Sequence, residues 1–324
     1  MGRARRGRGG RRVRRPSRSL RPCTRSRGHR GLNRKGTNDM DVQAELWWAT
    51  GHGLGESARW FGGAYHWVDI ESGSVLRARP GGPLERTELG GIVSAVFDAG
   101  DGCEGVVAGD RILVLRDGRI EKEYPLPDLA DRHGRTNDAR VDPLGRLWVG
   151  TVGRGSDARA AVLWRLDAEG PAVVRSGLTL SNGLDFDAAG TAYHADTFDR
   201  VVYRYRMGPD GEIAQVEEAV RVDGLPDGLC LDAADGLWIA LWGGGRAERY
   251  DAGGRRTHVI RTPGASQVTS LCFGGPRLDE VFLTTAAEDV DEPNAGAVFR
   301  ARVDVTGRAE SIWTRERETG ASHD

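Results

Sequence analysis

The stretch Asp232-Ala-Ala-Asp-Gly-Leu-Trp238 decides the fold of this chain, because its pattern recurs along the sequence. It combines a turn of small and acidic residues with the start of a strand. The pattern occurs twice more, each time 45 residues earlier, in Asp187-Ala-Ala-Gly-Thr-Ala-Tyr193 and Asp142-Pro-Leu-Gly-Arg-Leu-Trp148. Three further turns fit the same frame, at Phe61-Gly-Gly63, Asp98-Ala-Gly-Asp-Gly102 and Phe273-Gly-Gly-Pro276. The chain therefore contains six units of roughly 37 to 45 residues.

The segments between these turns are short and rich in Val, Leu, Trp and Tyr, and almost none has a sustained helical period. Clear examples are 146–151, 161–166, 201–205, 236–242 and 281–285. The repeat length is that of a four-stranded propeller blade, so the pattern predicts an all-β, six-bladed β-propeller over residues 41–324. We expect Ala44–Trp48 and Ser311–Thr314 to lie in one sheet and close the ring.

The charge is divided unevenly between two parts of the 324-residue chain. The 46 Lys+Arg and 47 Asp+Glu nearly cancel, but residues 1–40 hold 15 of the bases and one acid, which leaves about −15 on the rest. Such a segment buries too little apolar surface to fold, so residues 1–40 are predicted to be a disordered Arg-rich leader. It is either a nucleic-acid-binding arm or the product of a start codon assigned too early. The second interpretation is favoured, because Arg outnumbers Lys 44 to 2, as in GC-rich genes, and Met40 stands where ordered sequence begins.

Composition also excludes several classes of protein. No run of 18 apolar residues occurs, which argues against a membrane partner. The four cysteines, at positions 23, 103, 230 and 272, form no CxxC pair and no dense disulfide framework. With no export signal, we expect a cytoplasmic monomer or small homo-oligomer. An acidic body is a poor nucleic-acid binder, so only the leader offers a route to that partner.

One position in each repeat carries the candidate chemistry. Four or five residues before the six turns stand the ring positions: Glu56, Val93, Asn137, Asn182, Asp227 and Thr269. If these segments are the innermost strands, the six side chains surround the central channel. Two carboxylates and two amides are donors that Ca²⁺ or Mg²⁺ prefers, and the ring has no His or Cys for a typical zinc site. Each residue alone is explained by turn capping, but four blades in register favour a cation site.

Five motifs in order resemble the regucalcin (senescence marker protein)/gluconolactonase family, from about Glu45 to about Ala286. They are Leu54-Gly-Glu-Ser57, Arg135-Thr-Asn-Asp138 followed by Val141-Asp-Pro-Leu-Gly145, Ser181-Asn-Gly-Leu-Asp185, Pro226-Asp-Gly-Leu-Cys230 and Thr269-Ser-Leu-Cys-Phe-Gly-Gly275. The resemblance implies a six-bladed propeller with one divalent cation near the top of the channel. Ca²⁺ is the first expectation, with Zn²⁺, Mn²⁺ or Mg²⁺ as alternatives.

The resemblance also implies a role for each matching residue. Glu56, Asn182 and Asp227 would be the metal ligands. Asn137 would lie beside the metal and contact the substrate or a metal-bound water, and Arg135 would donate hydrogen bonds to sugar oxygens. Family members hydrolyse aldonolactones, so a sugar lactone is the expected substrate. Ester hydrolysis also needs a base for the attacking water, and Asp227 is the expected general base.

The sequence departs from the family in the loop 152–160, which is shorter and has no Glu to help hold the sugar. Asp157 is a candidate substitute, and Arg154 a candidate rim residue that favours a different, acidic substrate. His52, next to the ring, is a second candidate rim residue. Two alternatives to a sugar lactonase remain: a broad lactonase or phosphotriesterase-like hydrolase on the same scaffold, and a calcium-binding propeller without catalysis.

Overall fold

The recurring aspartate closes the turn that links the first two strands of a blade. Oδ1 of Asp232 accepts hydrogen bonds from the backbone N–H groups of Ala234 (2.9 Å) and Gly236 (2.8 Å). Its Oδ2 accepts one from the indole N–H of Trp238 at 2.9 Å. Asp142 makes the equivalent backbone and indole contacts two blades earlier. The spacing from Asp to Trp is therefore set by one side chain that caps a turn and anchors the following strand.

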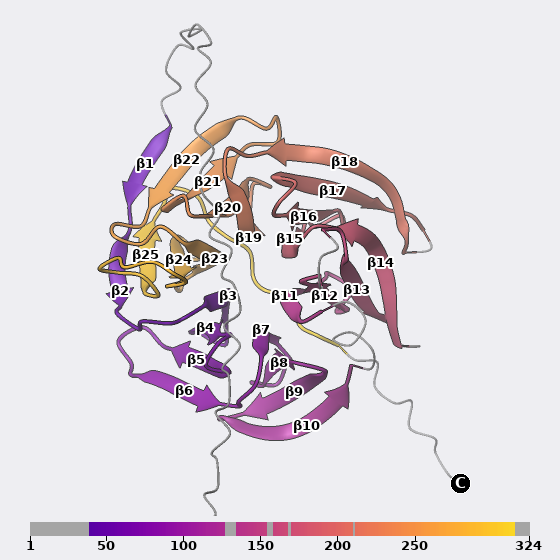
Figure 1. The fold of residues 1–324 in the computed structure, drawn as a ribbon, viewed down its shortest axis with the longest axis horizontal. Coiled ribbons are helices and arrows are strands. Elements are labelled where there is room, and N and C mark those ends of the chain that lie inside the picture. The colour runs from indigo at the N-terminus through magenta and orange to yellow at the C-terminus, as the bar shows by residue number, and fades with distance from the viewer. Residues whose placement is uncertain (1–38, 127–133, 154–157, 168–169, 210, 315–324) are drawn as a thin grey trace, which may run out of the picture. The chain divides into compact units, whose positions relative to one another are not determined.

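The computed structural model describes residues 39–126, 134–153, 158–167, 170–209 and 211–314. These residues form six sheets of strands arranged in a ring, which confirms the six-bladed β-propeller (Figure 1). The described part of the chain contains no helix, and hence none that could span a membrane. Residues 1–38 of the expected leader lie outside the described residues.

In blades 1 to 4 four antiparallel strands follow one another from the channel outward, whereas blades 5 and 6 each receive their outermost strand from the N-terminal part of the chain. Blade 1 contains β3 (Gly55–Phe61), β4 (Ala64–Asp69), β5 (Ser74–Ala78) and β6 (Leu84–Glu88). Blade 2 contains β7 (Val93–Asp98), β8 (Glu104–Ala108), β9 (Arg111–Arg116) and β10 (Arg119–Pro125). Blade 3 contains β11 (Thr136–Val141), β12 (Leu147–Thr151), β13 (Ala161–Asp167) and β14 (Gly170–Leu178).

The other three blades repeat this order. Blade 4 contains β15 (Ser181–Phe186), β16 (Ala192–Asp196), β17 (Val201–Met207) and β18 (Ile213–Arg221). Blade 5 contains β19 (Leu225–Leu231), β20 (Leu237–Trp242), β21 (Arg246–Tyr250), β22 (Arg256–Arg261) and, at its edge, β1 (Met40–Gln43). Blade 6 contains β23 (Val268–Gly274), β24 (Glu280–Thr285), β25 (Val298–Arg302) and β2 (Glu45–Trp48). Strand β1 pairs parallel with β22, and β2 antiparallel with β25.

The N-terminal segment closes the ring as expected, but the C-terminal segment does not. Strand β2 pairs antiparallel with β25 and completes blade 6. The expectation that Ser311–Thr314 joins the same sheet is wrong. The backbone N–H of Trp313 instead donates to the carbonyl of Asp98 at 2.8 Å, and that of Thr314 to Gly145 at 3.0 Å. The segment after β25 therefore crosses the ring to blades 2 and 3 (Figure 1).

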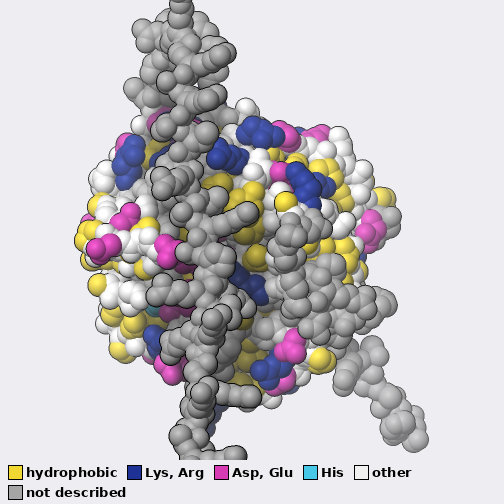
Figure 2. All heavy atoms as spheres, viewed as in Figure 1, with side chains coloured by type: hydrophobic (Ala, Val, Ile, Leu, Met, Phe, Trp, Pro, Cys, Tyr) yellow, Lys and Arg dark blue, Asp and Glu magenta, His cyan; other side chains and the backbone are white. Residues whose placement is uncertain are grey.

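The core lies between neighbouring blades, where the sheets face one another. Trp67, Trp148 and Trp238, from the second strands of blades 1, 3 and 5, are fully buried there. Acidic and basic side chains are interspersed over the face that Figure 2 shows. The apolar faces of the strands thus pack the blades against one another, and side chains of the innermost strands line the channel.

Candidate metal centre in the channel

A β-bulge interrupts the innermost strand of every blade at the ring position. In β11, β15, β19 and β23 the ring residue is the first one that has no partner opposite it in the neighbouring strand. In β3 and β7 the shift in register follows the ring residues Glu56 and Val93 directly. A bulge re-aims the side chain at which it occurs. Each ring residue therefore lies either in a bulge or directly before one.

Two oxygen atoms of the ring have no partner. Oδ1 of Asn182 and Oδ1 of Asp227 are buried and make no hydrogen bond within the described part of the chain. The residues are 6% and 4% exposed. A buried acceptor without a partner costs about 1–3 kcal/mol, and such atoms in native proteins require an explanation. Two of them on neighbouring innermost strands indicate a ligand site.

Negative charge is concentrated at the same place. Burial, together with the nearby charge of Asp138, raises the pKa of Glu56 to about 8. Burial and the charges of Glu56 and Asp138 also hold the pKa of Asp227 well above its usual range. The backbone N–H of Ser57 donates to Oε2 of Glu56 at 2.8 Å and opposes this effect only in part. A bound cation would offset this mutual repulsion.

The donor set fits a cation only if an amide takes part. Within the described ranges, no three side chains of His, Cys, Asp or Glu are placed to hold a metal ion. Glu56 and Asp227 therefore need the Asn182 amide oxygen as a third protein ligand. Carboxylate and amide oxygens, completed by water, are the ligands of hard cations such as Ca²⁺.

Arg135 and Asn137 form a linked pair at the start of β11. Nη1 of Arg135 donates to Oδ1 of Asn137 at 2.8 Å and to the carbonyl of Thr136 at 3.1 Å. Nδ2 of Asn137 donates to the carbonyl of Ser181 at 3.1 Å, across to blade 4. Arg135 is half-buried, and its pKa is lowered by burial although Glu56, Glu288 and Asp227 oppose the shift. The structure therefore brings Arg135 into the field of both candidate carboxylate ligands.

Asp138 and Arg59 also lie at the site, although neither was expected there from the sequence. Nη2 of Arg59 donates to Oδ1 of Asp138 at 3.0 Å, and Arg59 is 2% exposed. Oδ1 of Asp138 also accepts the backbone N–H of Ala139 at 2.8 Å. Asp138 was visible as the residue after Asn137 in the motif, whereas nothing in the sequence marked Arg59. This ion pair balances one of the three carboxylates and leaves Glu56 and Asp227 without such a partner.

His52, one of the two candidate rim residues, lies in the loop before β3 and is buried. Its Nε2 accepts the indole N–H of Trp67 at 2.8 Å, so the ring proton is on Nδ1, which faces Oδ2 of Asp69 at 3.4 Å. The residue is 2% exposed, and both ring nitrogens are engaged. His52 thus supports the loop that leads into β3. The other candidate rim residue, Arg154, and the proposed substitute Asp157 lie outside the described residues.

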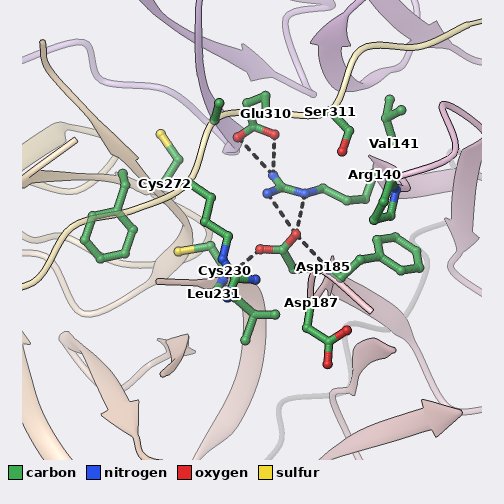
Figure 3. A pocket seen from close by; sticks show the side chains of 15 residues that line it. Arg140, Val141, Asp185, Asp187, Cys230, Leu231, Cys272, Glu310 and Ser311 are labelled. Carbon is green, nitrogen blue, oxygen red and sulfur yellow. Dashed lines mark hydrogen bonds and ion pairs between the residues drawn. The ribbon is translucent and has the colours of Figure 1, made fainter. Parts of the chain in front are cut away.

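A separate pocket of about 180 Å³ lies three residues further along the innermost strands (Figure 3). Three strand residues span about 10 Å. Arg140 dominates this pocket, with ion pairs of 2.9 Å to both Asp185 and Glu310. Cys230 and Cys272 line it as buried free thiols, and burial raises the pKa of each well above its usual range. Arg140, Asp185 and Glu310 thus balance one another's charges in this pocket, unlike Glu56 and Asp227 in the ring.

Comparison with known proteins agrees with this arrangement. Residues 54–287 match the family model described as the SMP-30/Gluconolactonase/LRE-like region. The chain is 34% identical to a pentonolactonase from Haloferax volcanii over 273 residues, which cover 76% of this chain and 88% of that protein. It is 33% identical to a 6-deoxy-6-sulfogluconolactonase from Pseudomonas putida, with 76% and 90% covered.

Among solved structures, a regucalcin from Agrobacterium tumefaciens superposes with a TM-score of 0.77 at 24% identity, covering 85% of this chain and 99% of its own. That likeness concerns the fold. The family model spans more than half of the chain and includes Glu56, Asn137, Asn182 and Asp227. This chain belongs to the SMP-30/gluconolactonase/LRE-like family.

Proposed function

We propose that this protein is a divalent-cation-dependent lactonase that opens a sugar lactone to the sugar acid. The observation that carries the proposal is the pair of buried, unpartnered oxygens on Asn182 and Asp227 beside the carboxylate of Glu56. Relatives whose names describe them as lactonases of sugar acids support the substrate class.

Glu56, Asn182 and Asp227 would hold the cation. Their all-oxygen donor set favours Ca²⁺ and also suits Mg²⁺ or Mn²⁺, while Zn²⁺ is less well matched. When bound, such a cation supplies Lewis-acid polarisation of the ester carbonyl. The raised pKa values of Glu56 and Asp227 in the metal-free protein follow from the same uncompensated charge that makes the site attractive to a cation.

The protein's own side chains account for substrate binding and proton transfer. Arg135 and Asn137, joined to one another, offer donors and an acceptor to sugar hydroxyl groups. Asp227 acts as the general base: it takes a proton from the attacking water while the new carbon–oxygen bond forms. The ring carbon–oxygen bond of the lactone then breaks, and the leaving oxygen receives the proton that Asp227 took from the water, which gives the hydroxy acid. Burial makes the Asp227 carboxylate more basic and so better suited to this role.

The test is acid release from gluconolactone and a pentonolactone, measured above the spontaneous rate. Wild-type protein should hydrolyse at least one lactone, lose the activity in EDTA and regain it with Ca²⁺ or Mn²⁺. Asp227→Asn should lower kcat at least about 100-fold, within the range of general-base effects. Glu85→Gln is the matched control, since it neutralises an exposed carboxylate that pairs with Arg77.

Each alternative has its own signature in this assay. Undiminished hydrolysis in EDTA would contradict the role of the cation, and wild-type rates for Asp227→Asn would contradict the assignment of the base. Turnover of a phosphotriester at a rate above that of every lactone would favour the phosphotriesterase-like alternative. Cation binding without turnover of any ester would favour the binding propeller.

A further inference from the structure

An amide ligand poses a problem that a carboxylate ligand does not. Both oxygens of Glu56 or Asp227 can face a cation, whereas Asn182 has one acceptor end and one donor end. If the amide of Asn182 turned over, its NH₂ group would face the cation. Something in the protein must therefore fix the orientation of this side chain.

The hydroxyl group of Thr197, which directly follows β16, fixes it. Oγ1 of Thr197 lies 2.9 Å from the carbonyl oxygen of Pro226, and a carbonyl can only accept, so the single hydroxyl proton is used there. Towards Asn182, at 3.1 Å, the same Oγ1 can then only accept. The end of the amide that faces Thr197 must be the NH₂ group, and Oδ1 must face the other way. That oxygen is the buried atom without a partner.

Thr197 also connects two of the candidate ligands. Pro226, whose carbonyl takes the hydroxyl proton, directly precedes Asp227 in β19. Thr197 is 5% exposed, so water does not replace these contacts readily. The register of the blades places Asp69 and Trp242 at the same point in blades 1 and 5, whose ligands are carboxylates. Among these three blades, the hydroxyl group occurs only in blade 4, whose candidate ligand is an amide that must be held in one orientation.

We propose that Thr197 is a positioning residue of the cation site: it holds the Asn182 amide with its oxygen towards the channel and ties it to the strand of Asp227. The proposal rests on the proposed function in one respect, namely that a cation binds at Glu56, Asn182 and Asp227. Outer hydrogen-bond partners of metal ligands typically contribute 10–100-fold to metal affinity.

The test measures cation affinity directly, by calorimetric titration of EDTA-stripped protein with Mn²⁺ and Ca²⁺. Thr197→Val, which keeps the shape and removes the hydroxyl, should raise Kd about 10–100-fold. Thr197→Ser, which restores the hydroxyl, should stay within about threefold of wild type. Thr262→Val is the matched control: it removes a buried hydroxyl that donates to the carbonyl of Ala265 at 2.8 Å, and it should leave Kd unchanged.

A second background separates orientation from packing. In Asn182→Asp, either carboxylate oxygen can face the cation, so adding Thr197→Val should weaken binding less than threefold. An equal loss in both backgrounds would overturn the proposal, because Thr197 would then act by packing alone. Unchanged affinity in Thr197→Val would overturn it too. Failure of the wild-type protein to bind either cation would instead contradict the proposed function, and the proposal for Thr197 with it.

Discussion

At the scale of single residues, the buried carboxylate of Glu56 should strengthen cation binding while it lowers the stability of the protein without a cation. Its pKa of about 8 lies above the ordinary value of 4.5. Between these pH values the unfolded chain loses the proton that the folded protein keeps, so Glu56 destabilises the fold increasingly as pH rises from about 4.5 to 8. We expect Glu56→Gln to raise the thermal midpoint in EDTA at pH 8 by about 5 °C and to remove the rise that Ca²⁺ produces in wild type.

Glu248 provides the contrasting residue. It is also buried, but hydrogen bonds from Tyr250 and Arg246 outweigh the effect of burial and lower its pKa. Glu248→Gln should therefore lower the thermal midpoint under the same conditions and leave the Ca²⁺-induced rise intact. A lower midpoint for Glu56→Gln would show that the charge of Glu56 is compensated within the protein, which would contradict the assignment of an uncompensated carboxylate at the ring.

At the scale of the strand, Gly183 allows the bulges of β15 and β19 to approach one another. Gly183 follows Asn182, and a Cβ on it would come within 2.4–2.7 Å of backbone atoms of Asp227, Gly228 and Leu229. We expect Gly183→Ala to push β15 and β19 apart, to destabilise the protein by about 1–3 kcal/mol and to weaken cation binding. Urea unfolding in EDTA and calorimetric titration measure the two effects.

Gly224 is the control for this substitution. A Cβ there meets only side-chain atoms of Leu241, at ordinary distances of 3.5–3.8 Å. Gly224→Ala should therefore change neither stability nor cation affinity appreciably. Full cation affinity in Gly183→Ala would show that close contact between the bulges is not needed to place Asn182 and Asp227.

The sequence predicted the ring positions well because the distortion that creates them repeats. Counting four or five residues back from each turn finds these residues because every innermost strand carries a bulge at its ring position or directly after it. Thr197 and Arg59 had no such signal, because a hydroxyl or guanidinium becomes informative only when its partners are known. The nearness of His52 to Glu56 in the sequence likewise did not reveal that its Nε2 accepts the indole N–H of Trp67.

At the scale of the whole molecule, the ring is held closed by two segments outside the repeat. Strand β2 completes blade 6. The segment after β25 ties that blade to blades 2 and 3, where Trp313 stacks edge-on against Phe97 and Tyr124 at centroid distances of 5.5 and 5.6 Å. The sequence predicted the first closure because β2 is a clear apolar strand. It missed the second because a non-repeating segment has no periodicity to reveal its partner.

A series of three shortened chains tests how the N-terminal segment contributes to this closure. A chain that starts at Asp39 keeps every contact described here, so we expect wild-type thermal midpoint, cation affinity and lactone hydrolysis. A start at Ala44 also removes β1 and its exposed pairs of Asp39 with Arg256 and Asp41 with Arg261. Each such pair contributes at most about 1 kcal/mol, so the loss of stability should be small.

A start at Ala49 should have a far larger effect, because it removes β2. The edge of β25 would then be unpaired, and Tyr65 and Phe282 would lose Trp47, which packs on them at 5.6 and 4.9 Å. We expect this chain to aggregate or unfold, as judged by circular dichroism and sedimentation. Trp47→Ala in the full chain separates packing from strand pairing and should cost about 3–5 kcal/mol while the ring stays closed. If the chain that starts at Asp39 lost its activity, residues 1–38 would be part of the functional unit. If the chain that starts at Ala49 stayed folded, the C-terminal segment alone would be enough to close the ring.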